Sequence, residues 1–454
     1  MKKEPFVFDL SALLRQKTQF TFREQINYVF RLSVPAMLAQ ISSILMQYID
    51  AAMVGKLGAE SAAAIGVVAS STWLLGGLVS ACAAGFTVQI AQAIGAGDYV
   101  RARSVLRQGM VVGAAFSLFL CVLSLCISRP LPLWLGAETS ITRDATAYFA
   151  LCAAALPVWQ FSMLMGGALR SSGNMKVPSV LSVLLCVLDI VGNYVYIFVL
   201  QLGVVGAALG TLTAEGIVAL LMTYFCVVRS PVLRLCGRNE RWRIEKSCLQ
   251  EANHIAIPLG FQQFALCGAQ IVSTRLVAPL GTVAIAANSF GITAEALCYM
   301  PGYGIGEAAT TMVGQSVGAK RKDLARHFAW LTIGAGMVVM GVCGVIMYAC
   351  APLVMRFLTP DAAVSALGAS VLRIEMFAEP LFAASIVASG ALRGAGDTLV
   401  PGILNLVSMW CVRIVLTVAL IGQYGLHGAW IAMAVELCVR GVLFLVRVKR
   451  ERWL

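Results

Sequence analysis

Acidic and amide side chains interrupt apolar segments in the first half of the chain. Asp50 lies in LMQYIDAAMVG, and Asp189 lies in CVLDIVGNYVY, where Asn193 follows four residues later. Residues three or four apart share one face of a helix, so Asp189 and Asn193 are expected to point the same way. An ionisable group inside an apolar helix is costly and is a functional candidate by default. We therefore expect Asp50, Asp189 and Asn193 to bind a proton or a small cation.

Two further polar pairs have the same spacing. Thr211 and Glu215 are four residues apart in the next apolar segment, and Gln47 precedes Asp50 by three. This spacing predicts that three helices of the first half each present a polar stripe. Thr211 and Glu215 are added to the candidate ion site, and Gln47 becomes a candidate for lining a substrate cavity.

The second half carries a different set of acids. Glu295 lies well inside ITAEALCYMPGYG and is a candidate for binding a cationic ligand. Glu379 precedes Pro380, so it either lines the same cavity or satisfies a backbone group that the proline frees, and Glu375 pairs with Arg373 or with solvent. Glu436 and Arg440, four residues apart, are expected to form a structural ion pair.

The composition explains why these charges matter. The chain has 454 residues, of which 59% are hydrophobic and only 12% charged, and its mean hydropathy is +0.84. These values exclude soluble and disordered classes and indicate an all-α polytopic membrane protein. With about 20 residues per span, we expect twelve transmembrane helices, at 32–54, 61–93, 108–128, 146–168, 177–199, 207–228, 255–279, 285–316, 329–351, 371–392, 400–421 and 428–447.

Basic residues between the predicted spans fix the orientation. They are concentrated before helix 1, after helices 2 and 4, in the 229–253 connector and in the C-terminal tail, whereas the opposite loops hold only Lys56, Arg129, Arg143 and Arg356. The positive-inside rule then places both termini and the connector in the cytoplasm. The net charge of +12 is therefore a signal of topology and not of nucleic-acid binding.

The chain matches itself at a constant offset of 223 residues. Pro35 corresponds to Pro258, and the run Gly167–Arg170 corresponds to Gly390–Arg393. Beyond a shift of one residue, Gly203, Gly206 and Ala207 correspond to Gly425, Gly428 and Ala429. Each repeat holds six predicted helices, so the two repeats are parallel, as in secondary transporters with a cavity between their halves.

This repeat defines the expected domains: a cytoplasmic segment 1–31, an N-lobe 32–228, the connector 229–253, a C-lobe 254–447 and a tail 448–454. At the repeat-equivalent positions the C-lobe has Ser273 for Asp50, Val412 for Asp189 and Leu416 for Asn193. A structural requirement would act on both repeats, whereas an ion site need exist only once. This asymmetry favours a functional role for the N-lobe acids.

Other chemistries lack their residues. The fourteen Cys are scattered and the three His are isolated, so no metal site and no cofactor are expected. GxxxxGK[ST] is absent, which argues against ATP hydrolysis. A membrane transferase would need clustered His or Asp at a membrane face, and three isolated His do not supply it. We therefore expect a transporter and not an enzyme.

The motifs VPAMLAQ, YIDAAMVGKLGA, IAQAIGAGDYVRAR and GALRSSGNMKVP, with the second-half copies MVGQSVGAKRKDLAR and GALRGAGDTLVP, resemble the multidrug and toxic compound extrusion (MATE) family. The resemblance covers nearly the whole chain. It implies two six-helix lobes forming a V, in a bacterial inner membrane. It also implies export of cationic or amphipathic compounds by antiport with H⁺, or with Na⁺ bound at Asp50, Asp189 and Asn193.

Within this resemblance, Asp50 matches the family's helix 1 acid, Asp189 and Asn193 match the helix 5 pair, and Thr211 matches a polar position of helix 6. The second-lobe acids of the sodium-coupled branch fall near Leu266 and Phe382. The closest alternative function is a flippase for lipid-linked or other amphipathic precursors in the same superfamily. Substrate identity, the choice between H⁺ and Na⁺, and the oligomeric state stay open.

Overall fold

The chain is helical throughout its described part. The computed structural model describes residues 20–236 and 244–454, in which no strand occurs. Eleven of the helices described there are long and apolar enough to cross a membrane. The multi-pass, all-α class predicted from composition is confirmed.

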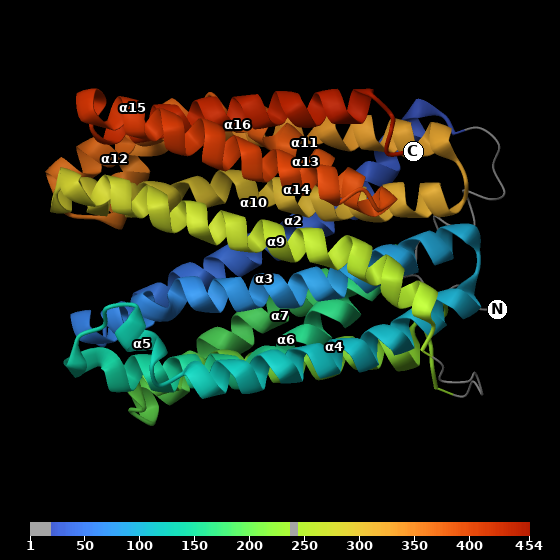
Figure 1. Ribbon diagram of the computed structural model, residues 1–454, viewed down its shortest axis with the longest axis horizontal. Coiled ribbons are helices and arrows are strands. Elements are labelled where there is room, and N and C mark those ends of the chain that lie inside the picture. Colours follow the sequence, from blue (N-terminus) through green and yellow to red (C-terminus); the bar gives the residue numbers. More distant parts are fainter. Residues whose placement is uncertain (1–19, 237–243) are drawn as a thin grey trace. The chain divides into compact units, whose positions relative to one another are not determined.

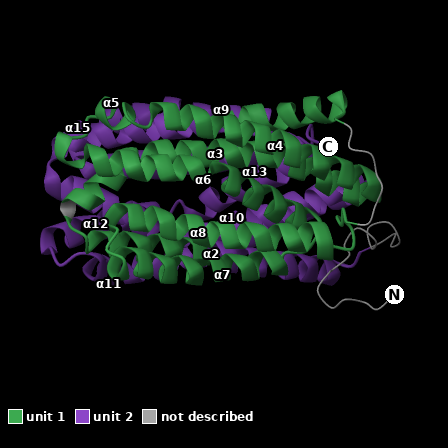
Figure 2. Ribbon diagram, turned by 90° about the horizontal axis from the view of Figure 1, so that it is seen from below, with its two compact units in different colours: residues 1–16, 42–260 green, residues 17–41, 261–454 purple. Residues whose placement is uncertain are grey.

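Two compact units divide the chain (Figure 2). The described residues of unit 1 fall within 42–260, and those of unit 2 within 20–41 and 261–454. The dividing points lie inside two helices, α2 and α9, each of which contributes to both units. Those helices carry the repeat-equivalent prolines Pro35 and Pro258.

The helices of the first half, in order, are α2 (Phe22–Gly55), α3 (Ala59–Ala96), α4 (Tyr99–Ile127), α5 (Leu131–Trp134), α6 (Thr139–Ser171), α7 (Lys176–Tyr194), η1 (Val195–Val199), α8 (Gly203–Tyr224) and η2 (Phe225–Arg229). Those of the second half are α9 (Lys246–Val277), η3 (Ala278–Leu280), α10 (Thr282–Gly318), α11 (Lys322–Leu358), α12 (Ala362–Glu375), α13 (Glu379–Ala395), α14 (Leu399–Val407), η4 (Ser408–Ile414), α15 (Val415–Tyr424) and α16 (Leu426–Lys449).

Several helices extend beyond the predicted apolar spans. The third span was expected to begin at residue 108, but α4 begins at Tyr99, where the Asp98 carboxylate accepts a hydrogen bond of 2.9 Å from the Arg101 backbone N–H. Such N-caps stabilise a helix start. The apolar window locates the part that lies in the membrane, whereas capping and hydrogen bonding extend the helix into the basic flanking residues.

The predicted tenth span, 371–392, is two helices and not one. α12 ends at Glu375 and α13 begins at Glu379, ahead of Pro380. Proline has no N–H and is tolerated in the first turn of a helix but not in its interior. The sequence prediction missed this break because the apolar pattern continues across it. α12 and α13 together supply the twelfth span.

Close packing in unit 2 depends on small residues. Figure 1 shows α10, α13 and α16 side by side. A β-carbon on Gly390 of α13 would collide with the Gly306 carbonyl of α10, and one on Gly441 of α16 would collide with the Leu381 carbonyl of α13. Small residues let helix backbones approach closely in membranes, where burial of apolar surface does not drive association.

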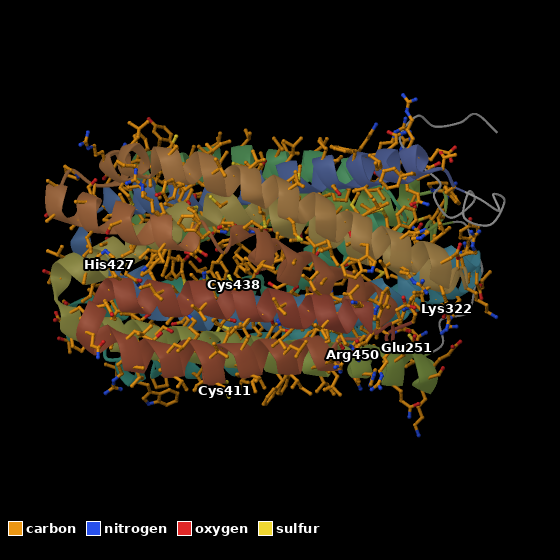
Figure 3. The ribbon with its side chains drawn as sticks, turned by 90° about the horizontal axis from the view of Figure 1, so that it is seen from above. Glu251, Lys322, Cys411, His427, Cys438 and Arg450 are labelled. Carbon is orange, nitrogen blue, oxygen red and sulfur yellow. The ribbon has the colours of Figure 1, made fainter. Side chains whose placement is uncertain are left out.

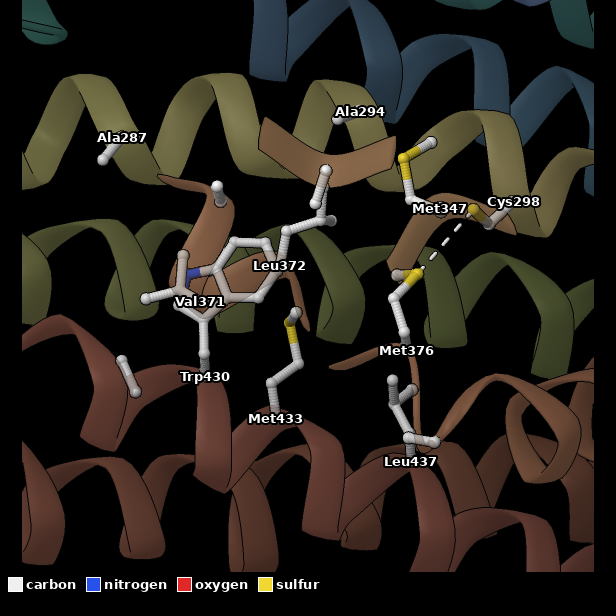
Figure 4. Close-up of a cluster of buried hydrophobic side chains, with 14 of the residues drawn as sticks. Ala287, Ala294, Cys298, Met347, Val371, Leu372, Met376, Trp430, Met433 and Leu437 are labelled. Carbon is white, nitrogen blue, oxygen red and sulfur yellow. Dashed lines mark hydrogen bonds between the residues drawn. The ribbon is translucent and has the colours of Figure 1, made fainter. Parts of the chain in front are cut away.

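A hydrophobic core fills the other end of unit 2. Figure 4 shows Trp430, Met433 and Leu437 of α16 facing Met376 and Cys298, whose sulfur atoms are 3.9 Å apart. Trp430 is 2% exposed, and its indole N–H donates to Asn288 Oδ1 at 3.0 Å. This contact satisfies the polar atom of a buried tryptophan and fixes α16 against α10.

The ends of unit 2 differ in charge. In Figure 3, Lys322 and Arg450 lie at one end and His427 at the other. At the basic end, ion pairs join Arg326 to Glu451 at 2.6 Å and Arg447 to Asp397 at 2.7 Å. Sequence analysis predicted this end to be cytoplasmic. Most of segment 1–31 and part of the 229–253 connector lie outside the described residues, and the predicted lobe boundaries stay predictions.

Candidate functional site

One amide joins two carboxylates inside unit 1. The side-chain nitrogen of Asn193 donates to Asp50 Oδ1 at 2.8 Å and to Asp189 Oδ2 at 3.0 Å. Asp189 is 0% and Asn193 1% exposed, whereas Asp50 is half-buried. The structure thus brings together three candidates that are up to 143 residues apart in the chain.

Glycines position the amide. A β-carbon on Gly192 of α7 would lie 3.3 Å from the Gly210 Cα of α8, and one on Gly210 would overlap Asn193 Oδ1. The two helices therefore approach backbone to backbone at the turn that carries Asn193. The π-helical turn η1 follows directly at Val195, and such turns in long helices are frequent at functional sites.

Two oxygens of this site have no hydrogen-bond partner among the described residues: Asp189 Oδ1 and Asn193 Oδ1. Buried acceptors without partners are rare and costly. Carboxylate and amide oxygens are also the groups that hold a proton or a hard cation. The geometry suits a small positive ligand shared between α2 and α7.

Three more side chains surround the carboxylates. Thr211 of α8 interacts with Asp189, although its hydroxyl also donates to the Ala207 carbonyl at 3.3 Å. Glu215, one turn further along α8, interacts with Ser162 and with Asp189. Tyr148 of α6 interacts with both Asp50 and Asp189. Sequence reasoning missed Tyr148, because a single tyrosine in a membrane helix is usually a packing residue.

The cavity candidates fall in different places. Gln47 is an exposed residue on α2 of unit 1, one turn before Asp50. Glu295 and Glu379 are buried in unit 2, where Glu295 interacts with Glu375, Arg413 and Arg440. The role of all three as substrate contacts stays a prediction.

Two explanations for the unit 2 acids are wrong. Glu379 does not satisfy a backbone group beside Pro380, because neither of its carboxylate oxygens has a hydrogen-bond partner. Glu375 is 0% exposed and also unpartnered, while Arg373 donates instead to the Tyr348 carbonyl at 3.1 Å. The predicted ion pair of Arg440 with Glu436 is confirmed at 3.2 Å.

Arg413 is a further residue that sequence reasoning missed. It lies in the π-helical turn η4, in the middle of the span Leu399–Tyr424. The signal was available, because a lone arginine in NLVSMWCVRIVLTVAL is as costly in a membrane as a carboxylate.

Known proteins resemble this chain over most of its length. The sequence profile of the MatE family matches residues 35–195 and 258–419, one match in each repeat. The probable multidrug resistance protein NorM of Thermotoga maritima is 25% identical over 436 residues, which cover 94% of this chain and 92% of that protein. The protein of the same description from Agrobacterium fabrum is 27% identical and covers 92% of this chain and 93% of its own.

Solved structures agree on the fold. An outward-facing MATE family transporter of the MOP superfamily matches with a TM-score of 0.91 and 21% identity, over 98% of this chain and 99% of that one. A MATE structure in the straight conformation matches with a TM-score of 0.90, 21% identity and the same coverage.

Two repeats of six membrane helices, with ionisable groups buried in each unit, define a multi-pass membrane transporter. The chain belongs to the MatE family. The resemblance to MATE efflux transporters that the loop motifs indicated is confirmed, and the protein is a transporter rather than an enzyme.

Proposed function

We propose that the protein is a secondary active multidrug exporter that exchanges cationic or amphipathic compounds for protons. Na⁺ is the alternative coupling ion. The observation that carries the proposal is the Asn193 amide held between Asp50 and Asp189. The names of the relatives, probable multidrug resistance proteins, support the substrate class.

The geometry suggests how the ion is coupled to movement. Two carboxylates that share one neutral amide repel each other, and a bound proton or sodium ion relieves that repulsion. The site joins α2 to α7, so its occupancy changes how firmly these helices are held together. An ion that binds one conformation better than another shifts the equilibrium between them. Outward release of substrate can then be driven by inward movement of the ion.

The cellular setting belongs to the same proposal. We place the protein in a bacterial inner membrane with the N-lobe 32–228, the C-lobe 254–447 and both termini arranged so that the basic loops and the connector are cytoplasmic. Its partners are then the small-molecule substrate and the membrane lipid, without ATP, nucleic acid or a bound cofactor.

Transport by purified protein in liposomes tests the proposal. We expect the lipophilic cation tetraphenylphosphonium to accumulate against its own gradient when a proton gradient is imposed in the absence of ATP. A sodium gradient applied alone, at equal pH on both sides, separates the two coupling ions. Liposomes without protein are the control. Movement of the cation that responds to neither gradient would reject ion coupling.

A further inference from the structure

Arg413 faces a small cavity in unit 2. The cavity has a volume of about 20 Å³, and its polar lining comes from Gln270, Ser273, Asn288, Arg413 and Thr417, beside the indole of Trp430. This space suits one particle of about the size of a water molecule. Arg413 is the only charged side chain among the described residues that line it.

The cavity is the repeat counterpart of the carboxylate site in unit 1. Gln270 and Ser273 stand 223 residues after Gln47 and Asp50. Ala429 and Met433, which also line the cavity, stand 222 residues after Ala207 and Thr211. The same helices of the fold therefore build a polar chamber in each unit, with two carboxylates in unit 1 and a guanidinium in unit 2.

The lining is rich in hydrogen-bond donors. Asn288 uses its oxygen to accept from Trp430 at 3.0 Å, so its amide N–H groups remain for another partner. The Ser273 hydroxyl is buried and has no hydrogen-bond partner among the described residues. The Thr417 hydroxyl already donates to the Arg413 carbonyl at 2.7 Å. Donors that converge beside a positive charge bind anions.

Arg413 has donors to spare. Its hydrogen bond of 2.8 Å goes to the sulfur of Met433, which is a weak acceptor. A guanidinium carries five N–H donors. Glu295 and Glu375 act on Arg413 electrostatically, but neither lines the cavity. They moderate the positive potential there and leave the cavity wall itself cationic.

We propose that this cavity binds a small monovalent anion through Arg413, Ser273 and Asn288. The anion is either a free halide or the carboxylate group of a bound substrate, since both offer one negative charge and acceptor capacity. The transporter would then hold a cation in one repeat and an anion in the other. This proposal does not depend on the coupling ion of unit 1.

Thermal unfolding of the purified full-length protein tests the proposal. A ligand that binds only the folded state raises the unfolding midpoint in proportion to its concentration relative to its dissociation constant. We expect the midpoint to rise with sodium chloride or bromide relative to sodium gluconate at equal ionic strength. Sodium acetate against neutral acetamide tests the carboxylate. A halide response identifies a free ion, and a response to acetate alone identifies a substrate carboxylate.

Variants assign the response to the cavity. Arg413→Gln should lose it, with at least a tenfold weaker apparent affinity, and Ser273→Asp should lose it by restoring the acid of the first repeat. Arg413→Lys keeps the charge and should retain most of the response, which also covers a failure of Arg413→Gln to fold. Arg373→Gln is the matched control, because it removes one positive charge outside the cavity and should respond like wild type.

Two outcomes overturn the proposal. One is a midpoint that neither halide nor acetate raises above the gluconate and acetamide references. The other is a response of the same size in folded Arg413→Gln or Ser273→Asp as in wild type, because the anion then acts elsewhere on the protein.

Discussion

The carboxamide of Asn193 occupies the space that a β-carbon on Gly210 would take. Gly210 of α8 is therefore part of the candidate ion site, although it has no side chain. Its role is to let α8 approach α7 while Asn193 points at Asp50 and Asp189. The position of the amide is set by helix packing as much as by the sequence of α7.

Gly210→Ala should impair gradient-driven export by displacing the Asn193 amide. We expect a loss of roughly tenfold, which corresponds to about 1.4 kcal/mol. The measurement is export of tetraphenylphosphonium from liposomes at matched protein content. Gly216→Ala on the same helix is the control, because a β-carbon there meets nothing within 4 Å. Equal activity of the two variants would remove Gly210 from the site.

The fold was largely predictable from sequence. Membrane spans follow from length and hydropathy, and the 223-residue repeat, which Pro35 and Pro258 share, gives two sets of six. The break between Glu375 and Glu379 was not predictable, because apolar residues continue across it and Pro380 is compatible with a helix start. Hydropathy reports the environment of a segment and not the continuity of its hydrogen bonds.

The site was predictable in its residue types but not in its limits. Spacing on one face linked Asp189 to Asn193, and membrane burial selected Asp50. Nothing in the chain connected Tyr148 to them, since that contact depends on the packing of α6. Arg413 was missed for a different reason. The search concentrated on acids, which the expected cationic ligands favour.

Two buried glutamates of unit 2 should respond oppositely to replacement by glutamine. Glu436→Gln removes the carboxylate 3.2 Å from Arg440 and leaves that guanidinium without its partner, which costs about 3–5 kcal/mol in comparable buried pairs. Glu379→Gln removes a carboxylate whose oxygens have no hydrogen-bond partner, so it should preserve or raise stability.

The unfolding midpoint in detergent checks this contrast, with wild type as the reference. We expect Glu436→Gln to lower it clearly and Glu379→Gln to leave it unchanged or higher. A midpoint that falls equally in both variants would show that Glu379 has a stabilising partner after all.

The basic loops should be cytoplasmic, because the reverse orientation would violate the positive-inside rule across the whole chain. In a background without native Cys, Glu240→Cys should resist an impermeant thiol reagent in intact cells and react once the membrane is permeabilised. Residue 240 lies in the connector, outside the described residues. Glu138→Cys, an exposed position ahead of α6, is the control and should react in intact cells. The opposite labelling pattern would invert the topology.

Asp50→Asn should abolish gradient-driven export while the protein stays folded. The amide keeps the size and hydrogen-bonding capacity of the carboxylate, but it cannot carry a charge that cycles with the ion. It also places an amide opposite the Asn193 nitrogen, which is now 2.8 Å from Asp50 Oδ1. If Asp50 were only structural, Asp50→Asn would be tolerated and Asp50→Leu would destabilise the protein.

Asp144→Asn, a replacement of an exposed aspartate in the same unit, is the control for the change in charge and should export like wild type. The measurement is export under an imposed proton gradient at equal membrane abundance, with the unfolding midpoint as the check on folding. Wild-type export by Asp50→Asn would show that Asp50 does not couple the ion. The role would then pass to Asp189, which shares the Asn193 amide at 3.0 Å, or to Glu295 in unit 2.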